Sequence, residues 1–203
     1  MMDNHQATST ISPTLNSGCL GIVLAGGLSS RMGKNKAELN HFSEQQDMLN
    51  FSERLLIGCG ITNTVISGDN YQVADKYKQL GPLAGIYSVI EQYQPSSILA
   101  IPVDLPLLTS QTLSNLKLKG ELSQKACFYQ DNYLPLYLPV NAFTELFFTT
   151  AFERSAKNKR GPSMKQLLAN IPHQSLPLKN TQSLFNCNTP EQWQQAQHLY
   201  SQN

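Results

Sequence analysis

The chain has 203 residues, 40% hydrophobic and 14% charged, which is enough to bury the core of one α/β domain but too little for two comfortable ones. Its formal net charge of +1 provides no general field for nucleic acid or a membrane surface, and no apolar run approaches the length of a membrane span. The four cysteines form no Cys-x-x-Cys pair and the N-terminus lacks a signal-peptide pattern, so we expect a cytoplasmic protein with reduced thiols rather than a disulfide framework or a zinc site.

The first predicted strand leads into a glycine-rich loop. Residues 1–17 are rich in Ser, Thr, Asn and Gln, so we expect a disordered leader there and a single domain over residues 18–203. Ile22 to Leu24 is typical of a short buried strand, which Ala-Gly-Gly then ends. Small residues leave backbone N–H groups open to an anion, and the cations Arg31, Lys34 and Lys36 follow closely. This stretch predicts a phosphate-binding loop, with a plain strand-to-helix turn as the alternative.

Two common nucleotide-binding motifs do not fit this loop. A P-loop has four residues between its glycines and a hydroxyl after its Lys. Here five residues separate Gly27 from Gly33, and Asn35 follows Lys34. The dinucleotide fingerprint G-x-G-x-x-G also fails, because Gly26 and Gly27 are adjacent.

The same stretch resembles the signature of the molybdenum cofactor guanylyltransferases and, more broadly, of the nucleotidyltransferases that share their fold. That signature is Leu-Ala-Gly-Gly, then Ser-x-Arg-Met-Gly, then a Lys. The matching residues are Leu24, Ala25, Gly26, Gly27, Ser29, Arg31, Met32, Gly33 and Lys36. The resemblance implies that Leu24 to Gly27 and Lys36 bind the nucleotide and that Arg31 and Lys36 are catalytic.

The next elements are a short extended piece with a turn over residues 37–43, a helix over residues 48–57 and a strand over residues 64–66. In the family, the loop after that strand commonly offers an Asn to the guanine nucleotide. Ser67 stands at that position here, with Asp69 or Asn70 as alternatives.

Gly81 and Pro82 mark a turn and the start of a helix that runs to about Gln92. Gly85 lies one turn into it, where glycine is costly unless close helix–sheet packing or the approach of a ligand requires it. Gly-Pro-Leu-Ala-Gly resembles a family motif, which favours the nucleotide pocket for Gly81 and Gly85. The resemblance also implies a nucleotide-contacting carboxylate a few residues earlier, for which Asp75 is the nearest candidate.

The clearest buried strand runs from Ser97 to Val103, and Asp104 follows it directly. Ligands of open α/β sheets gather outside the carboxyl ends of the strands, so Asp104 should face the same crevice as the glycine loop. A carboxylate there suits Mg²⁺, which takes one or two carboxylates together with substrate phosphates. The alternative is an Asp that only begins a turn. Pro-Val-Asp-Leu-Pro resembles the metal-binding Asp-x-Pro stretch of the family, which favours Mg²⁺ at Asp104.

We expect most of the second half of the chain to form helices and strands with a structural role. We expect a helix over residues 109–117 capped by Thr109 or Ser110, a hairpin of strands 126–130 and 134–138, a long amphipathic helix over residues 141–157 and a helix over residues 164–169 capped by Ser163. The apolar stripe of the long helix, which includes Phe143, Leu146 and Phe152, indicates core packing. Arg154 and Arg160 belong to a basic cluster at its end, which either complements the helix dipole or binds a second, phosphorylated substrate.

Two asparagines precede the last predicted helix. A short strand from Leu184 should lead to this helix, which Thr189 and Gln192 open as a capping box. Capping does not explain Asn186 and Asn188, which alternate onto one face before the helix and are placed to hydrogen-bond substrate. Asn-x-Asn-Thr-Pro-Glu resembles the C-terminal motif of the family.

Together, these patterns predict a single Rossmann-like, doubly wound α/β domain with a mostly parallel, mixed sheet and helices on both faces. The resemblance implies transfer of GMP from GTP to the terminal phosphate of molybdenum-loaded molybdopterin, with Mg²⁺ as cofactor and release of pyrophosphate. No general base is needed, because the attacking phosphate is already ionised. We expect a monomer whose partners are the substrates GTP and molybdopterin and, transiently, proteins that deliver and receive the cofactor. The alternatives are a CTP- or sugar-phosphate-dependent nucleotidyltransferase of the same fold and a non-catalytic nucleotide-binding module.

Overall fold

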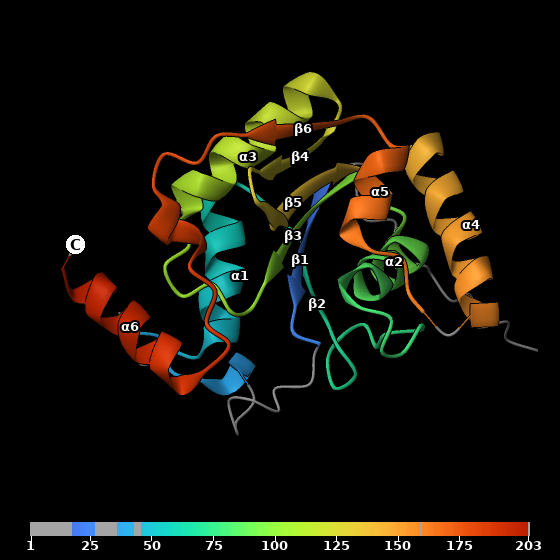
Figure 1. Ribbon diagram of the computed structural model, residues 1–203. Coiled ribbons are helices and arrows are strands. Elements are labelled where there is room, and N and C mark those ends of the chain that lie inside the picture. Colours follow the sequence, from blue (N-terminus) through green and yellow to red (C-terminus); the bar gives the residue numbers. More distant parts are fainter. Residues whose placement is uncertain (1–17, 27–35, 43–45, 159, 203) are drawn as a thin grey trace, which may run out of the picture.

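A six-stranded mixed sheet forms the centre of the molecule (Figure 1). The computed structural model describes residues 18–26, 36–42, 46–158 and 160–202. The strands, in the spatial order β2-β1-β3-β5-β4-β6, are β1 (Cys19–Leu24), β2 (Thr64–Ser67), β3 (Ser97–Pro102), β4 (Ala126–Tyr129), β5 (Asn132–Pro139) and β6 (His173–Leu176). β1 pairs in parallel with β2 and β3, and β4 with β6, whereas β5 is antiparallel to both of its neighbours. The predicted fold class is confirmed.

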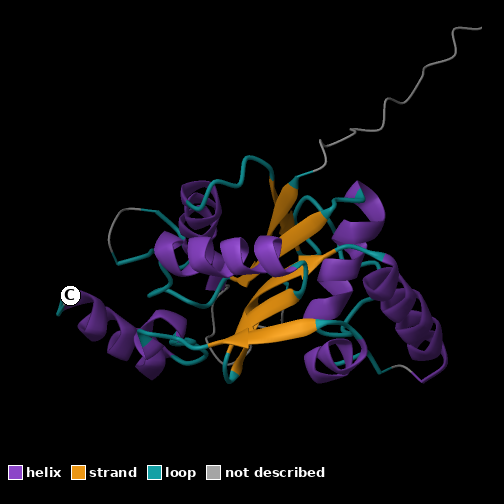
Figure 2. Cartoon of the chain, turned by 90° about the horizontal axis from the view of Figure 1, so that it is seen from above, coloured by secondary structure: helices purple, strands orange, loops and turns teal. Residues whose placement is uncertain are grey.

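Helices cover both faces of the sheet (Figure 2). The α-helices in the described residues are α1 (Met48–Gly58), α2 (Pro82–Tyr93), α3 (Ser110–Ser123), α4 (Ala142–Asn158), α5 (Met164–Asn170) and α6 (Pro190–Ser201), and the 3₁₀ helices are η1 (Lys36–Glu38) and η2 (Thr181–Leu184). None of these helices is long and apolar enough to cross a membrane.

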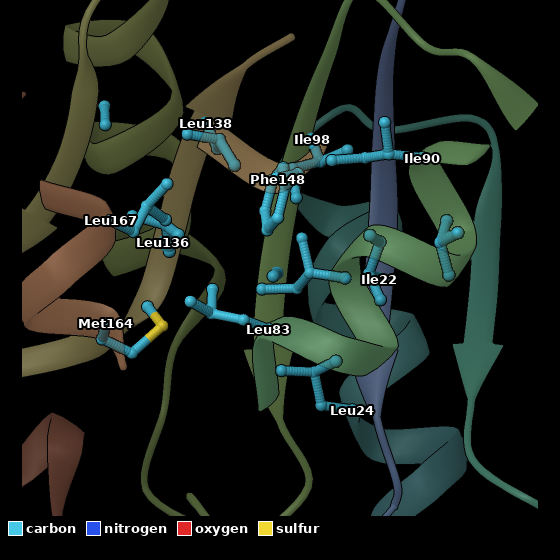
Figure 3. Packing of buried hydrophobic residues seen from close by; sticks show 14 of the residues in the cluster. Ile22, Leu24, Leu83, Ile90, Ile98, Leu136, Leu138, Phe148, Met164 and Leu167 are labelled. Carbon is cyan, nitrogen blue, oxygen red and sulfur yellow. The ribbon is translucent and has the colours of Figure 1, made fainter. Parts of the chain in front are cut away.

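Two hydrophobic cores separate the helices into two layers. Alternate residues of a strand point to opposite faces of the sheet. Ile22 therefore joins the core under α2, α4 and α5, whereas Val23 joins the core under α1 and α3. Figure 3 shows the first core, where Leu83 and Phe148 pack against Ile22 and its neighbours. Because β1 is buried on both faces, its sequence is a continuous apolar run rather than an alternating one.

The register of the parallel strands brings their carboxyl ends to one level. Leu24 at the end of β1 pairs with Ser67 of β2 and with Pro102 of β3. The residues that follow each strand therefore leave the sheet side by side, and they include Gly26 after β1 and Asp104 after β3. This edge positions the candidate site.

Five details of the elements predicted from the sequence are wrong. The chain forms the 3₁₀ helix η1 where an extended piece was expected from residue 37. α3 continues past Lys117, because Gly120 lets the ring of Tyr137 pack directly against the helix backbone. No strand forms at Leu184, which ends η2, and β6 was missed because its residues His-Gln-Ser-Leu are mostly exposed and polar. The apolar stripe of α4 is only partly buried, since Phe152 lies in the core whereas Phe143 and Leu146 are exposed.

Candidate active site

The loop after β1 is fastened to the end of β2. The backbone N–H groups of Ala25 and Gly26 both donate to the carbonyl oxygen of Ser67, at 2.9 and 3.2 Å. A Cβ atom on Gly68 would lie 3.0 Å from the Gly26 nitrogen, so a glycine is needed where these two loops touch. These first two loop amides are thus already paired within the protein. The predicted site residues Gly27 and Arg31 lie outside the described residues.

A charged cluster joins three segments that are far apart in the sequence. Lys36 Nζ donates to Asp104 Oδ2 at 3.1 Å and to Asn188 Oδ1 at 2.6 Å. Asn188 Nδ2 donates in turn to Asn186 Oδ1 at 2.7 Å. The structure therefore brings Lys36, Asp104 and both asparagines together. Since the side chains of Lys36 and Asp104 are only 16% and 17% exposed, their attraction is screened less than that of a surface pair.

The start of α6 holds the asparagine pair in place. The side chain of Gln192 accepts hydrogen bonds from the backbone N–H groups of Asn188 and Thr189, at 2.7 and 3.1 Å, as part of the predicted capping box. The Cys187 N–H donates to the carbonyl oxygen of Asp104 at 3.0 Å. These bonds fix Asn188 relative to Asp104 before any ligand binds.

His41 connects the Lys36 segment to the loop after Asp104. Its buried ring stacks on Phe51 with centroids 3.7 Å apart, and its Nε2 lies 2.8 Å from the carbonyl oxygen of Pro106. Because a carbonyl oxygen can only accept, Nε2 carries the proton in this bond. His41 belongs to no motif that we identified in the sequence, and its pairing with a backbone atom 65 positions away leaves no local signal.

The two oxygens of Asp104 have different surroundings. Oδ2 accepts from Lys36, whereas Oδ1 is buried and has no hydrogen-bond partner among the described residues. An unpaired buried carboxylate oxygen is costly, so this atom is suited to a cation. Among the described residues, no group of three or more His, Cys, Asp or Glu side chains could hold a metal ion. The site therefore fits a hard divalent cation that takes one carboxylate from the protein and its other ligands from phosphates and water.

A second cluster lies on the β2 side of the same edge. Ser67 Oγ donates to Asp75 Oδ1 at 3.3 Å. A Cβ atom on Gly26 would lie 3.4 Å from Asp75 Oδ2, which places this carboxylate beside the glycine loop. Burial raises the pKa of Asp75, as does the charge of Asp69 to a smaller extent, while the hydrogen bond from Ser67 lowers it.

Gly81 and Gly85, the two glycines of Gly-Pro-Leu-Ala-Gly at the start of α2, are required for different structural reasons. A Cβ atom on Gly85 would lie 2.6 Å from Ser67 Oγ and 3.1 Å from Asp75 Oδ1, so close helix–strand packing alone requires a glycine here. Gly81 precedes the helix with φ at 85°, a conformation that favours glycine. Contact of either residue with a nucleotide stays a prediction. The side chain of Leu24 is buried in the core, and its carbonyl oxygen accepts from the Val103 N–H at 3.3 Å.

Arg154 and Arg160 lie apart from the asparagines with which they were grouped. Both are exposed and line a cavity of about 840 Å³ between α4 and α5. These helices cover one face of the sheet, whereas the segment of Asn186 and Asn188 continues from η2, which packs on the other face. The structure thus divides the expected second-substrate residues between two places.

Comparison with known proteins identifies the family. Residues 21–170 match the MobA-like NTP transferase domain. Over 189 residues, the chain is 31% identical to the molybdenum cofactor guanylyltransferase of Xanthomonas euvesicatoria pv. vesicatoria (strain 85-10), an alignment that covers 91% of this chain and 97% of that protein. The chain belongs to the MobA-like NTP transferase family. It is therefore a nucleotidyltransferase, which sets aside the non-catalytic alternative and confirms the resemblance seen in the sequence.

Two solved structures show how widely this fold is shared. Molybdopterin-guanine dinucleotide biosynthesis protein A from Archaeoglobus fulgidus has a TM-score of 0.68 and 21% identity, covering 91% of this chain and 100% of that one. The 2-C-methyl-D-erythritol 4-phosphate cytidylyltransferase from Thermus thermophilus has a TM-score of 0.59 and 11% identity, again covering 91% and 100%. At these identities the likeness concerns the fold alone, so the fold does not decide the base of the nucleotide.

Proposed function

We propose that this MobA-like enzyme transfers GMP from GTP to the terminal phosphate of molybdopterin that carries molybdenum. An oxygen of that phosphate bonds to the α-phosphorus of GTP, the bond from this phosphorus to the bridging oxygen breaks, and pyrophosphate leaves with the electron pair. The 31% identity to a protein named molybdenum cofactor guanylyltransferase supports this substrate pair. The observation that carries the proposal is the contact of Lys36 with both Asp104 and Asn188, which unites the three motifs of the sequence at one edge of the sheet.

The chemistry requires two anionic phosphates to meet, so positioning and charge neutralisation supply most of the catalysis. Lys36 is proposed to place its positive charge between the two substrates, because it lies between the Asp104 carboxylate and the asparagine pair. Arg31 is proposed for the same neutralisation on the basis of the signature alone. The attacking phosphate is already ionised, so no side chain has to remove a proton.

Asp104 is proposed to hold Mg²⁺ through its unpaired Oδ1, since a single buried carboxylate oxygen suits a cation whose other ligands are phosphate oxygens and water. When bound, Mg²⁺ neutralises phosphate charge and orients the reacting groups. Lys36 keeps the other oxygen of Asp104 occupied and so leaves Oδ1 as the atom that is available for the metal.

The nucleotide is proposed to lie along the loop after β1, next to Ser67, Asp75 and the start of α2. Because Ala25 and Gly26 already donate their N–H groups to Ser67, the contribution of these residues is the close approach that small residues permit. Asn186 and Asn188 are proposed to bind molybdopterin, since they lie on the other side of Lys36.

A direct test compares GTP with CTP in a pyrophosphate-release assay that contains molybdopterin. We expect kcat/KM for GTP to exceed that for CTP by at least about tenfold, which corresponds to roughly 1.4 kcal/mol of discrimination. Omission of molybdopterin provides the control and should abolish release. A preference for CTP would instead favour the cytidylyl alternative, whose fold this chain shares.

A further inference from the structure

α4 carries two apolar faces, and only one of them enters the core. Phe148 and Phe152 are buried against the sheet. Phe143 and Leu146, in the first turns of the same helix, are 59% and 68% exposed. With the half-buried residues Phe147, Thr150 and Ala151, they follow one another at helical spacing and form a continuous stripe, of which Phe143 and Leu146 are the most exposed part among the described residues.

The stripe forms one wall of the 840 Å³ cavity, here called the α4–α5 groove. Its other wall consists of residues 160–163 and the exposed side of α5, where Gln166 and Asn170 lie. The groove is apolar near Phe143 and basic at the far end of α4, where Arg154 and Arg160 line it.

The shape of the groove suits a helix better than a small molecule. Binding sites for small molecules enclose most of the ligand surface, whereas Phe143 and Leu146 remain largely exposed to solvent. At 1.5 Å per residue, the stripe from Phe143 to Arg154 is roughly 16 Å long, or three helical turns. A helix of similar length, with apolar residues at positions i, i+3 or i+4 and i+7, would cover it.

The charge of the groove indicates which charged residues the partner carries. Arg154 and Arg160 are exposed, and neither forms an ion pair with a described residue. In a chain of net charge +1, this end of α4 is the main basic cluster of the sequence, and neither of the acidic residues of α4, Glu145 and Glu153, lines the groove. Guanidinium groups favour paired contacts with carboxylates.

We propose that the α4–α5 groove docks an amphipathic helix of another protein, with acidic residues at the end that meets Arg154 and Arg160. The basic end of the groove contacts the segment that precedes α2. Gly161 packs directly on the backbone of Leu80, just before Gly81 and α2, where a Cβ atom would overlap the Leu80 carbonyl. One wall of the groove is therefore packed on the segment that joins Asp75 to α2.

The test replaces Leu146 with a photo-crosslinking amino acid in the full-length protein in its own cells. The matched control replaces Leu122, which is 74% exposed and belongs to α3 on the opposite face. We expect an adduct that forms at position 146 and not at position 122. Mass spectrometry should map the crosslinked residue of the captured protein to an amphipathic helix that bears acidic side chains.

Purified captured protein then provides the affinity measurement. We expect Leu146→Glu, and Arg154→Glu combined with Arg160→Glu, each to weaken binding at least about tenfold, and Leu122→Glu to leave it unchanged. Leu146→Glu should retain full pyrophosphate release, which shows that the fold is intact and keeps this proposal separable from that of GMP transfer.

Three results would overturn the proposal. The first is the absence of any adduct at position 146 beyond that at position 122. The second is an adduct with another copy of the chain, together with a dimer in sedimentation velocity that Leu146→Glu abolishes. The third is a raised KM for molybdopterin in the variant that combines Arg154→Glu with Arg160→Glu, with no loss of protein binding, which would assign Arg154 and Arg160 to the second substrate.

Discussion

At the scale of single residues, Asp104 is the most unusual group in the described part of the chain. One of its oxygens accepts from Lys36, while the other is buried without a partner. A fold gains nothing from such an atom, because burying an unpaired carboxylate oxygen costs free energy. The cost is offset when a cation or a hydrogen-bond donor of a ligand occupies the position, so the surroundings of Asp104 are better explained by ligand binding than by stability.

Asp104→Asn tests this explanation. The substitution keeps the shape and an oxygen for Lys36 but removes the charge, so we expect kcat for pyrophosphate release to fall by at least about 100-fold. GTP binding, measured by fluorescence titration without turnover, should weaken by less than about tenfold, since most nucleotide contacts remain. Asp131→Asn, in the exposed turn between β4 and β5, is the matched control and should behave as the native protein. Native turnover in Asp104→Asn would remove the proposed metal role.

Sequence motifs identified the residues of the charged cluster. They did not identify residues that act through packing or through bonds to distant backbone atoms. Lys36, Asp104 and Asn188 were selected from separate motifs, and the structure brings them into contact. His41 was not selected, because a hydrogen bond to a distant carbonyl leaves no pattern in the sequence. Charge alone grouped Arg154 with the asparagines, but sequence charge does not say which face of a sheet a helix end will reach.

At the scale of elements, the cluster depends on how three segments are held together. The capping box of α6 fixes Asn188, and the Cys187 N–H joins that segment to Asp104. His41 provides the matching connection between the Lys36 segment and the Asp104 loop through Pro106. Lys36 itself has a long, flexible side chain, so its position relative to Asp104 depends on these backbone connections.

His41→Phe tests this positioning role. Phe should preserve the stacking on Phe51 but cannot donate to the Pro106 carbonyl, which leaves a buried acceptor unpaired. We expect kcat to fall about tenfold with KM for GTP changed less than about twofold, and the free energy of unfolding to fall by about 1–2 kcal/mol.

The control for His41 is Phe51→Leu, which weakens the stacking and keeps the hydrogen bond. It should lower the free energy of unfolding, measured by urea titration, by a comparable amount while leaving kcat within about twofold. Equal losses of kcat in the two variants would indicate that His41 contributes stability only. Partial recovery of kcat in His41→Gln, whose amide can donate, would support the hydrogen bond as the cause.

Elements with local signals were predicted well, and elements that depend on distant contacts were not. The predicted cap at Ser163 and the predicted capping box at Thr189 are confirmed, because a cap involves residues within one turn. β6 was missed because its place beside β4 comes from pairing with a distant strand rather than from its own composition. Similarly, α3 passes through Gly120 because of a contact with Tyr137 of β5, which a local propensity cannot include.

At the scale of the whole molecule, the layered fold keeps the candidate site at the edge of the sheet apart from the two hydrophobic cores on its faces. The strand–helix alternation was enough to predict a mostly parallel sheet with helices on both faces, although the strand order and the position of β5 were not predictable from single elements. In the described residues, the candidate site occupies the carboxyl edge of β1, β2 and β3, while both faces of these strands are used for packing. A polar site at the edge can therefore change without disturbing either core.

The reactivity of the cysteines tests how firmly the site and the cores are closed to solvent. All four cysteines are free, and three of them are buried. Burial raises the pKa of Cys19 to about 11, and burial together with the nearby charge of Asp104 raises that of Cys187 to about 12. Burial also raises the pKa of Cys59 and of Cys127. Since the thiolate is the reactive form, a pKa of about 12 in place of 9.0 leaves roughly 1,000-fold less thiolate at Cys187 at pH 8.

We therefore expect the native protein to react slowly with a thiol reagent such as dithionitrobenzoate at pH 8, and the protein in urea to release four equivalents at once.

The same pKa shifts determine how the free energy of unfolding changes with pH. An unfolded chain loses thiol protons near pH 9, whereas the folded protein retains them to about pH 11 at Cys19, so the free energy of unfolding should fall between these values. Cys187→Ala should make that fall shallower in urea titrations from pH 8 to pH 10.5. Rapid modification of Cys187 in the native protein, or an identical pH dependence in Cys187→Ala, would show that the segment beside Asp104 opens to solvent and that the site is not held as firmly as its hydrogen bonds indicate.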